Sequence, residues 1–139
     1  MIVNRLNSKS EYQNSKQIQM TEILKTKKYD LEDRTFTFAQ RVMKYVNELP
    51  KTISNLEIGK QLVRSAGSIG SNYIEANESL GKKDFAMKIK ISRKESKESR
   101  YWLRLSNPKV ENSAEQGLLI QESTELMNIF GAILRKVEV

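Results

Sequence analysis

The 139-residue chain contains neither cysteine nor histidine. Without cysteine it has no disulfide and no thiol nucleophile, and without histidine it has no Ser-His-Asp triad. The two absences also exclude zinc sites built on Cys or His, and di-iron bundles that rely on Glu-x-x-His pairs. An absence of cysteine fits a cytoplasmic location, which is where we expect the protein to act.

Proline, glycine and aromatic residues are scarce. The sequence has two prolines and six glycines, and aromatic residues make up 7% of it against 29% for charged residues. This composition is typical of a helical protein and not of a β protein. No apolar run approaches the roughly 20 residues that a membrane helix needs, and the polar N-terminus lacks the apolar core of a secretory signal. We therefore expect an all-α protein without a membrane contact.

Apolar residues recur at helical spacing in four segments of the chain. The spacing predicts helices over about residues 30–49, 55–80, 82–105 and 114–136. Helices of this length with short connections predict an antiparallel up-down four-helix bundle over residues 29–139. Residues 1–28 are polar and basic with weak periodicity, and are expected to form an N-terminal tail outside the bundle.

The ends of these helices carry recognisable signals. Pro50 ends the first helix and Gly81 ends the second. Capping boxes at Ser54–Glu57 and Ser113–Gln116 predict the starts of the second and fourth helices, because a Ser side chain and a Glu or Gln three residues later satisfy each other's backbone N–H.

A stretch of small residues, RSAGSIGSNYIEANES from Arg64 to Ser79, lies within the second predicted helix. It lacks the G-x-x-x-x-G-K-[ST] spacing of a phosphate-binding loop. Its glycines and serines are therefore interpreted as positions of close packing against the serines of the third helix, with a bend near Gly67–Gly70. Asn72, on the inward stripe, is expected to fix helix register and not to act in catalysis.

The net charge of +7 is concentrated in two segments. Residues 82–104 carry nine Lys or Arg residues against three acids, and residues 1–29 carry six against two. Most of the cations of the third helix share one face with a tyrosine, and this face consists of Lys83, Lys90, Arg93, Lys94, Lys97, Arg100, Tyr101 and Arg104. Two interpretations stay open: a solvated charged surface, or a surface that binds RNA or DNA through phosphates.

The third helix also has a second, semi-apolar flank beside its core stripe. The flank holds Ile91, Trp102 and Leu105, together with Glu95 and Glu98. Since one bundle interior needs only one stripe, the flank indicates either a very wide core or a subunit interface, and we favour the interface. The two glutamates are expected to face Arg64 or Arg100 in preference to doing acid–base chemistry.

The runs QLVRSAGSIGSNYIEANES (Gln61–Ser79) and KKDFAMKIKISRKESKESRYWL, which follows Gly81, resemble one protein family. Its first members were found encoded in intervening sequences of bacterial 23S ribosomal RNA genes. The family pattern is roughly R-x-A-x-S-I-P-x-N-I-x-E, then a K-x-x-F start to helix three and a later inward Glu. The matching residues are Arg64, Ala66, Ser68, Ile69, Asn72, Glu75, Lys82, Phe85 and Glu98. Gly70 stands where the family often has proline.

This resemblance, over about residues 30–137, implies a four-helix bundle that forms a homo-oligomer, typically a five-fold ring. It also relates the chain to the accessory variability proteins of diversity-generating retroelements, which bind a reverse transcriptase and nucleic acid through basic surfaces. For the family at large, no enzymatic activity or definite role is established. We thus expect a non-enzymatic bundle without cofactor, metal or catalytic residue that binds RNA, DNA or a nucleoprotein such as a reverse transcriptase. The alternative is a protein-interaction scaffold with no nucleic-acid role.

Overall fold

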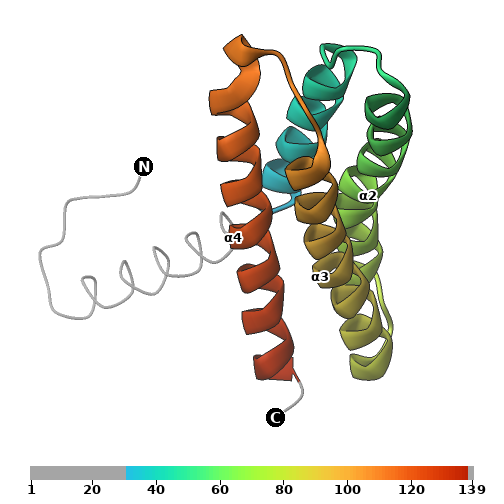
Figure 1. The fold of residues 1–139 in the computed structure, drawn as a ribbon. Helices are drawn as coiled ribbons and strands as arrows, with labels where there is room; N and C mark the ends of the chain where they lie inside the picture. The colour runs from blue at the N-terminus through green and yellow to red at the C-terminus, as the bar shows by residue number, and fades with distance from the viewer. Residues whose placement is uncertain (1–30, 138–139) are drawn as a thin grey trace, which may run out of the picture. The chain divides into compact units, whose positions relative to one another are not determined.

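The computed structural model describes residues 31–137, and every long element in that range is an α-helix. Residues 31–47 are helical, and they are followed by α2 (Ile53–Asn77), α3 (Lys82–Leu105), the short 3-10 helix η1 (Val110–Asn112) and α4 (Ser113–Val137). The long helices run alternately up and down and pack side by side (Figure 1). The predicted all-α four-helix bundle is confirmed, whereas the tail expected over residues 1–28 lies outside the described residues.

The bundle core is built from large apolar side chains at most levels and from serines where α2 meets α3. Its largest side chains without exposed surface include Phe38, Leu62, Ile69, Ile89, Leu103, Leu119, Leu126 and Phe130. Between α2 and α3, the hydroxyls of Ser65 and Ser99 are hydrogen-bonded at 2.9 Å, and Ser92 donates to the carbonyl of Ile69. Because these hydroxyls find partners, the small side chains allow close approach without leaving buried polar groups unpaired.

The two glycines of the small-residue stretch have different surroundings. A Cβ on Gly70 would lie 2.9 Å from Oγ1 of Thr35, in the 31–47 helix, whereas a Cβ on Gly67 would meet nothing within 4 Å. The prediction that both glycines pack against the serines of α3 is therefore wrong. Only Gly70 is a close-packing position, and its neighbour is the 31–47 helix. The helix itself continues without interruption through both glycines.

Both predicted capping boxes identify the correct region but the wrong residue. The N-cap of α2 is Thr52, whose Oγ1 accepts a hydrogen bond from the N–H of Asn55 at 3.1 Å. Ser54 already lies inside the helix. Ser113 has helical backbone angles of −62° and −38° because η1 leads directly into α4. A residue with this backbone cannot serve as an N-cap, which needs an extended conformation.

A buried asparagine does connect separate parts of the bundle, but it is Asn55 and not Asn72. The side chain of Asn72 donates to the carbonyl of Ser68 at 2.9 Å, within its own helix. The Nδ2 of Asn55 donates to the carbonyls of Pro50 and Asn107, and its Oδ1 accepts from the N–H of Asn107, each at 3.0 Å. Asn55 thereby fixes the start of α2 against the segment that follows α3.

Candidate nucleic-acid interface

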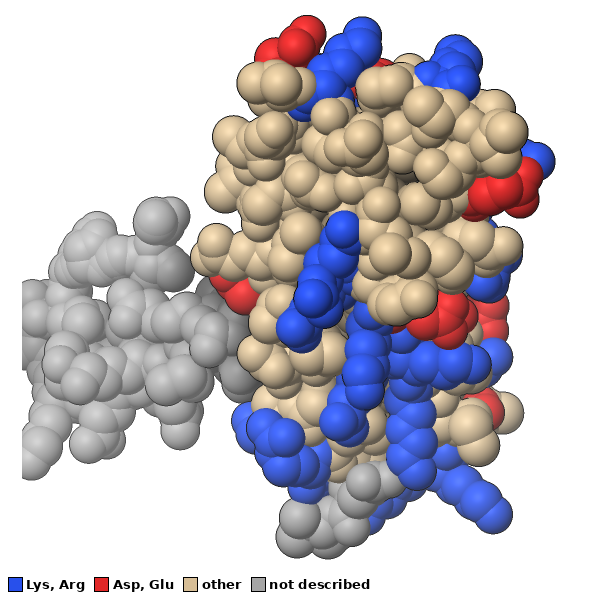
Figure 2. Space-filling model, viewed as in Figure 1, with Lys and Arg blue, Asp and Glu red and all other residues tan. Residues whose placement is uncertain are grey.

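The predicted basic face of α3 lies at the surface of the bundle. All of its members are exposed except Arg100, which is half-buried: Lys83, Lys90, Arg93, Lys94, Lys97, Tyr101 and Arg104. Figure 2 shows basic side chains gathered over the lower half of the bundle, along α3 and its junction with α4. The opposite side of α3 packs against the core with serines and aliphatic residues, so the charged side chains lie on the side that faces solvent.

A groove between α3 and α4 brings some of these residues together with a cation from the other helix. The groove has a volume of about 410 Å³ and is lined by Lys90, Arg93, Lys94 and Lys97 of α3 and by Gly131, Leu134 and Arg135 of α4. A Cβ on Gly131 would lie 3.6 Å from Nη1 of Arg135 and 3.9 Å from Nε of Arg93. Two guanidinium groups thus reach the same patch of bare backbone. We define these seven lining residues as the basic groove.

Arg135 was not among the predicted site residues. In the sequence it stands beside Lys136 at the end of a helix, where a cation is explained by the helix dipole alone. The signal that could have singled it out is Gly131, because residues four apart share one helix face and a glycine there opens space beneath the arginine.

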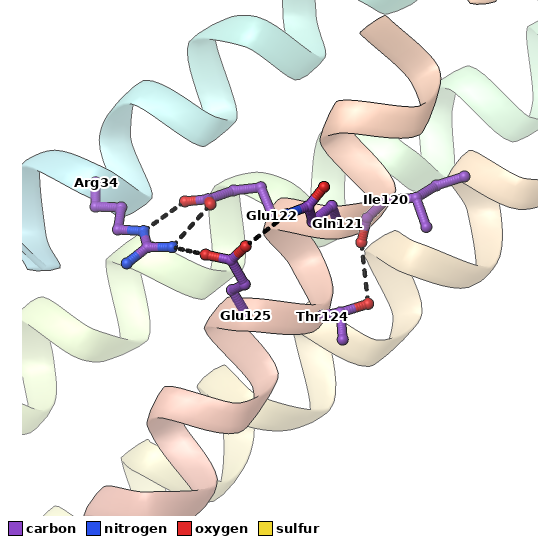
Figure 3. A network of polar contacts seen from close by, with 6 residues as sticks. All are labelled: Arg34, Ile120, Gln121, Glu122, Thr124 and Glu125. Carbon is purple, nitrogen blue, oxygen red and sulfur yellow. Dashed lines mark hydrogen bonds and ion pairs between the residues drawn. The ribbon is translucent and has the colours of Figure 1, made fainter. Parts of the chain in front are cut away.

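The acidic residues of α4 lie toward the 31–47 helix and are held there by arginines. Arg34 contacts Glu122 at 2.7 Å and Glu125 at 2.6 Å, and Arg41 contacts Glu115 at 3.0 Å. Figure 3 shows Glu122 and Glu125 both directed at the guanidinium of Arg34. The hydrogen bond to Glu122 is the main reason that the pKa of Arg34 is raised. No acidic residue lines the basic groove among the described residues.

The cations of α3 differ in their pairing according to the helix they face. On the α2 side, Lys88 contacts Glu75 at 2.7 Å. There Arg64 of α2 contacts Glu98 of α3 at 3.8 Å, so of the two partners expected for the glutamates, Arg64 and Arg100, it is Arg64 that pairs with Glu98. Within residues 31–137, no ion pair involves the groove residues Arg93, Lys94, Lys97 or Arg135. Unpaired cations on one surface repel one another, and an anion bound between them relieves that repulsion.

The semi-apolar flank of α3 is partly exposed. Leu105 is 49% exposed, and Ile91 and Trp102 are half-buried. The Trp102 ring packs edge-on against Tyr101, with 5.0 Å between the ring centroids. Its Nε1 is buried without a hydrogen-bond partner among the described residues, and so is Oε1 of Glu95.

Glu95 is the one carboxyl group of this flank that is nearly enclosed, at 8% exposure. Burial is the main cause that raises its pKa, and the neighbouring charge of Glu98 adds to the effect, whereas Arg64 and Lys94 oppose it. Glu98 is instead paired with Arg64. The two glutamates therefore differ in environment, but neither lies in the basic groove.

The described part of the chain holds no group of three or more acidic residues placed to bind a metal ion. None of its helices is long and apolar enough to cross a membrane. A second hollow, of about 440 Å³, lies between the 31–47 helix and α2 and is lined mainly by apolar residues, among them Val46, Leu56 and Val63.

Known proteins resemble this chain in both sequence and fold. The model of the 23S rRNA-intervening sequence protein family matches residues 27–131. A crystal structure of a Bacteroides thetaiotaomicron protein, described as of unknown function and from the S23 ribosomal protein family, is 31% identical with a TM-score of 0.60. That match covers 75% of this chain and 97% of the other. No curated protein matches the chain.

Proposed function

The chain belongs to the 23S rRNA-intervening sequence protein family, and from that premise we propose that it binds RNA or DNA, without catalysing a reaction, through the basic face of α3. The observation that carries the proposal is the separation of charge. The acids of α4 are paired with Arg34 and Arg41. Within residues 31–137, by contrast, no acidic residue lines the basic groove, and four of its cations form no ion pair: Arg93, Lys94, Lys97 and Arg135. A surface of this kind matches a row of phosphates.

Binding of this kind is led by phosphate contacts and is only weakly dependent on base sequence. Lysine and arginine side chains on one helix contact the backbone and release its counterions, so affinity falls as salt rises. Tyr101 is the one aromatic residue on the face and packs against Trp102, so stacking on bases contributes little. We place this activity in the cytoplasm, where RNA and DNA are accessible to the protein.

We also propose that the bundle assembles with copies of itself. A ring needs two different surfaces on each copy, because each subunit contacts one neighbour with one surface and the other neighbour with the second. Two apolar surfaces support this: the flank of α3 with Ile91, Trp102 and Leu105, and the hollow between the 31–47 helix and α2. The number five follows from the family resemblance. A ring repeats the basic face and strengthens binding through multivalency.

A charge-reversal experiment tests the proposed function. The triple variant Lys90→Glu, Lys94→Glu, Lys97→Glu is expected to bind an RNA or DNA duplex roughly 100-fold more weakly than the wild type at low salt. The matched control reverses three exposed lysines elsewhere, Lys44, Lys109 and Lys136, with the same change in net charge. Fluorescence anisotropy with a labelled duplex measures both.

Two results would contradict the proposal. One is a wild-type protein that fails to bind RNA and DNA even at low salt, and the other is an equal loss in the test and control variants. A cellular partner that is captured equally by the wild type and the Lys90, Lys94 and Lys97 variant, and that stays bound after nuclease treatment, would favour the protein-interaction scaffold. A reverse transcriptase or other nucleoprotein partner would be released from the variant.

A further inference from the structure

We propose that the phosphodiester backbone of the bound nucleic acid lies in the basic groove between α3 and α4, where Arg93 and Arg135 hold one phosphate above Gly131. This deepens the proposed function and rests on it. The binding surface is then a groove formed by α3 and α4 and not a single face of α3. In addition, α4 contributes a binding residue, although none was expected from it.

Gly131 allows two arginines to lie close together against α4. Its position on α4 is buried, and a side chain there would extend toward Arg135 and Arg93, at 3.6 Å and 3.9 Å from its first carbon. Because glycine has no side chain, the two guanidinium groups can approach the same point on the backbone of α4. Each guanidinium presents a planar fork of N–H donors that matches the oxygens of a phosphate, so two of them around one point form a clamp for a tetrahedral anion.

The groove extends beyond this clamp toward the start of α3. A further hollow of about 420 Å³ is lined by Lys82, Lys83, Ala86, Met87, Lys90 and Val137, and it shares Lys90 with the basic groove. The helix axis from Lys82 to Lys97 is about 22 Å long at 1.5 Å per residue. Along the axis of a duplex, one strand has a phosphate about every 3.4 Å, and the spacing along the winding strand is larger, so this length spans at most about six phosphates of one strand. Figure 2 shows Lys and Arg side chains gathered on this part of the surface.

The composition of the groove favours contacts with the phosphate backbone of a nucleic acid over contacts with its bases. Its lining includes five cations and no aromatic residue. Proteins that hold single strands by their bases use aromatic side chains as stacking platforms. Without such a platform, the groove recognises the charge and spacing of phosphates, which a double helix presents in a regular row.

A pair of adjacent residues on α4 provides a matched test. Arg135 lines the basic groove, whereas its neighbour Lys136 is exposed and is not part of the lining. Arg135→Glu and Lys136→Glu change the net charge equally, at neighbouring positions near the end of the same helix. Binding of a labelled RNA duplex and of a labelled DNA duplex, each of about 20 base pairs or roughly 70 Å for B-form DNA, is measured by anisotropy at several salt concentrations.

Arg135→Glu is expected to weaken binding of either duplex by about tenfold or more, and to lower the slope of log affinity against log salt by about one. Lys136→Glu is expected to stay within about twofold of the wild type. Circular dichroism and thermal unfolding of both variants verify that the bundle is folded. Since Arg135 is exposed and outside the core, the fold should be retained in each.

The other results separate this inference from the proposed function. If Arg135→Glu binds as the wild type does while the Lys90, Lys94 and Lys97 variant does not, the groove is wrong and the basic face of α3 stands. If Arg135→Glu and Lys136→Glu weaken binding equally, the effect is one of net charge and the groove is again wrong. If the wild type binds neither duplex, the proposed function fails and this inference fails with it.

Discussion

At the scale of single residues, Gly70 and Gly67 lie one turn apart in α2 and differ in what surrounds them. Gly70→Ala is expected to destabilise the bundle by about 1–3 kcal/mol, because the added carbon meets Oγ1 of buried Thr35 at 2.9 Å. Gly67→Ala, with nothing within 4 Å, is expected to stabilise it by roughly 1 kcal/mol through helix propensity. Urea unfolding measures both, and a Gly70→Ala variant as stable as Gly67→Ala would show that Thr35 does not constrain this position.

Glu95 gives a prediction for the pH dependence of stability. Burial raises the pKa of this carboxyl above its ordinary value of 4.5. The folded state therefore holds the proton more tightly than the unfolded state, and stability is lost as pH rises between the two pKa values. Glu95→Gln removes this titration. The free energy of unfolding of the variant, relative to the wild type, should thus increase as pH rises above the ordinary carboxyl pKa of 4.5.

Chemical denaturation at several pH values measures the difference for Glu95. The exposed residue Glu57 on α2 is a suitable control. Its side chain has only a surface contact, with Lys60 at 3.5 Å. Glu57→Gln makes the same chemical change at the surface and should alter the free energy of unfolding little. A constant difference between Glu95→Gln and the wild type across the range would mean that Glu95 is as solvated in the folded state as in the unfolded state.

The residue scale also marks the limits of what the sequence reveals. The pairing of Glu98 with Arg64 could be predicted, because both residues lie on stripes of helices that were expected to be neighbours. The N-cap residue of α2 could not be predicted, because Thr52 and Ser54 are both good capping residues. Only the backbone conformation decides between them, and Thr52 is the one with extended angles.

At the scale of elements, hydrophobic spacing was sufficient to predict four helices and their order. α3 was expected over residues 82–105, and the structure has it from Lys82 to Leu105. What the spacing does not reveal is how two helices lie against each other. The spacing of residues along the sequence defines the faces of each helix separately. The basic groove, by contrast, is formed by two helices, with Gly131 and Arg135 of α4 next to Arg93 of α3. Antiparallel packing brings these distant residues together.

Asn55 connects the start of α2 to the segment after α3, and its loss should affect the bundle as a whole. Asn55→Ala is expected to cost about 2–4 kcal/mol, because it leaves the carbonyls of Pro50 and Asn107 and the N–H of Asn107 without their partner. The control is Asn112→Ala, which removes one exposed hydrogen bond to Glu48. Thermal unfolding should shift strongly for the first variant only. Equal shifts would show that water replaces Asn55.

At the scale of the whole molecule, the semi-apolar flank of α3 predicts self-association. Light scattering of the wild type at micromolar concentration is expected to give a mass that is a multiple of the 16.1 kDa of one chain. Leu105→Glu, at a position 49% exposed, should lower that mass. Leu118→Glu, at 55% exposure on α4, is the control and should leave it unchanged. A wild type with the mass of one chain would contradict self-association.

The whole molecule also shows why charge is a better guide to function here than any single motif. Pairing of the α4 acids with Arg34 and Arg41 removes negative charge from the side of the bundle that faces α3. The same net charge spread evenly over the surface would bind polyanions weakly, whereas cations gathered along one groove create a continuous positive potential. The proposed interface is therefore a property of the packed bundle.

The dependence of duplex binding on salt tests the central claim most directly. Each phosphate neutralised in a complex with B-form DNA contributes about −0.9 to the slope of log affinity against log salt. With cations along the groove in contact with the backbone, we predict that the wild type binds a duplex of mixed sequence with a slope of about −3 or steeper. A slope near zero, or no binding at low salt, would contradict the account.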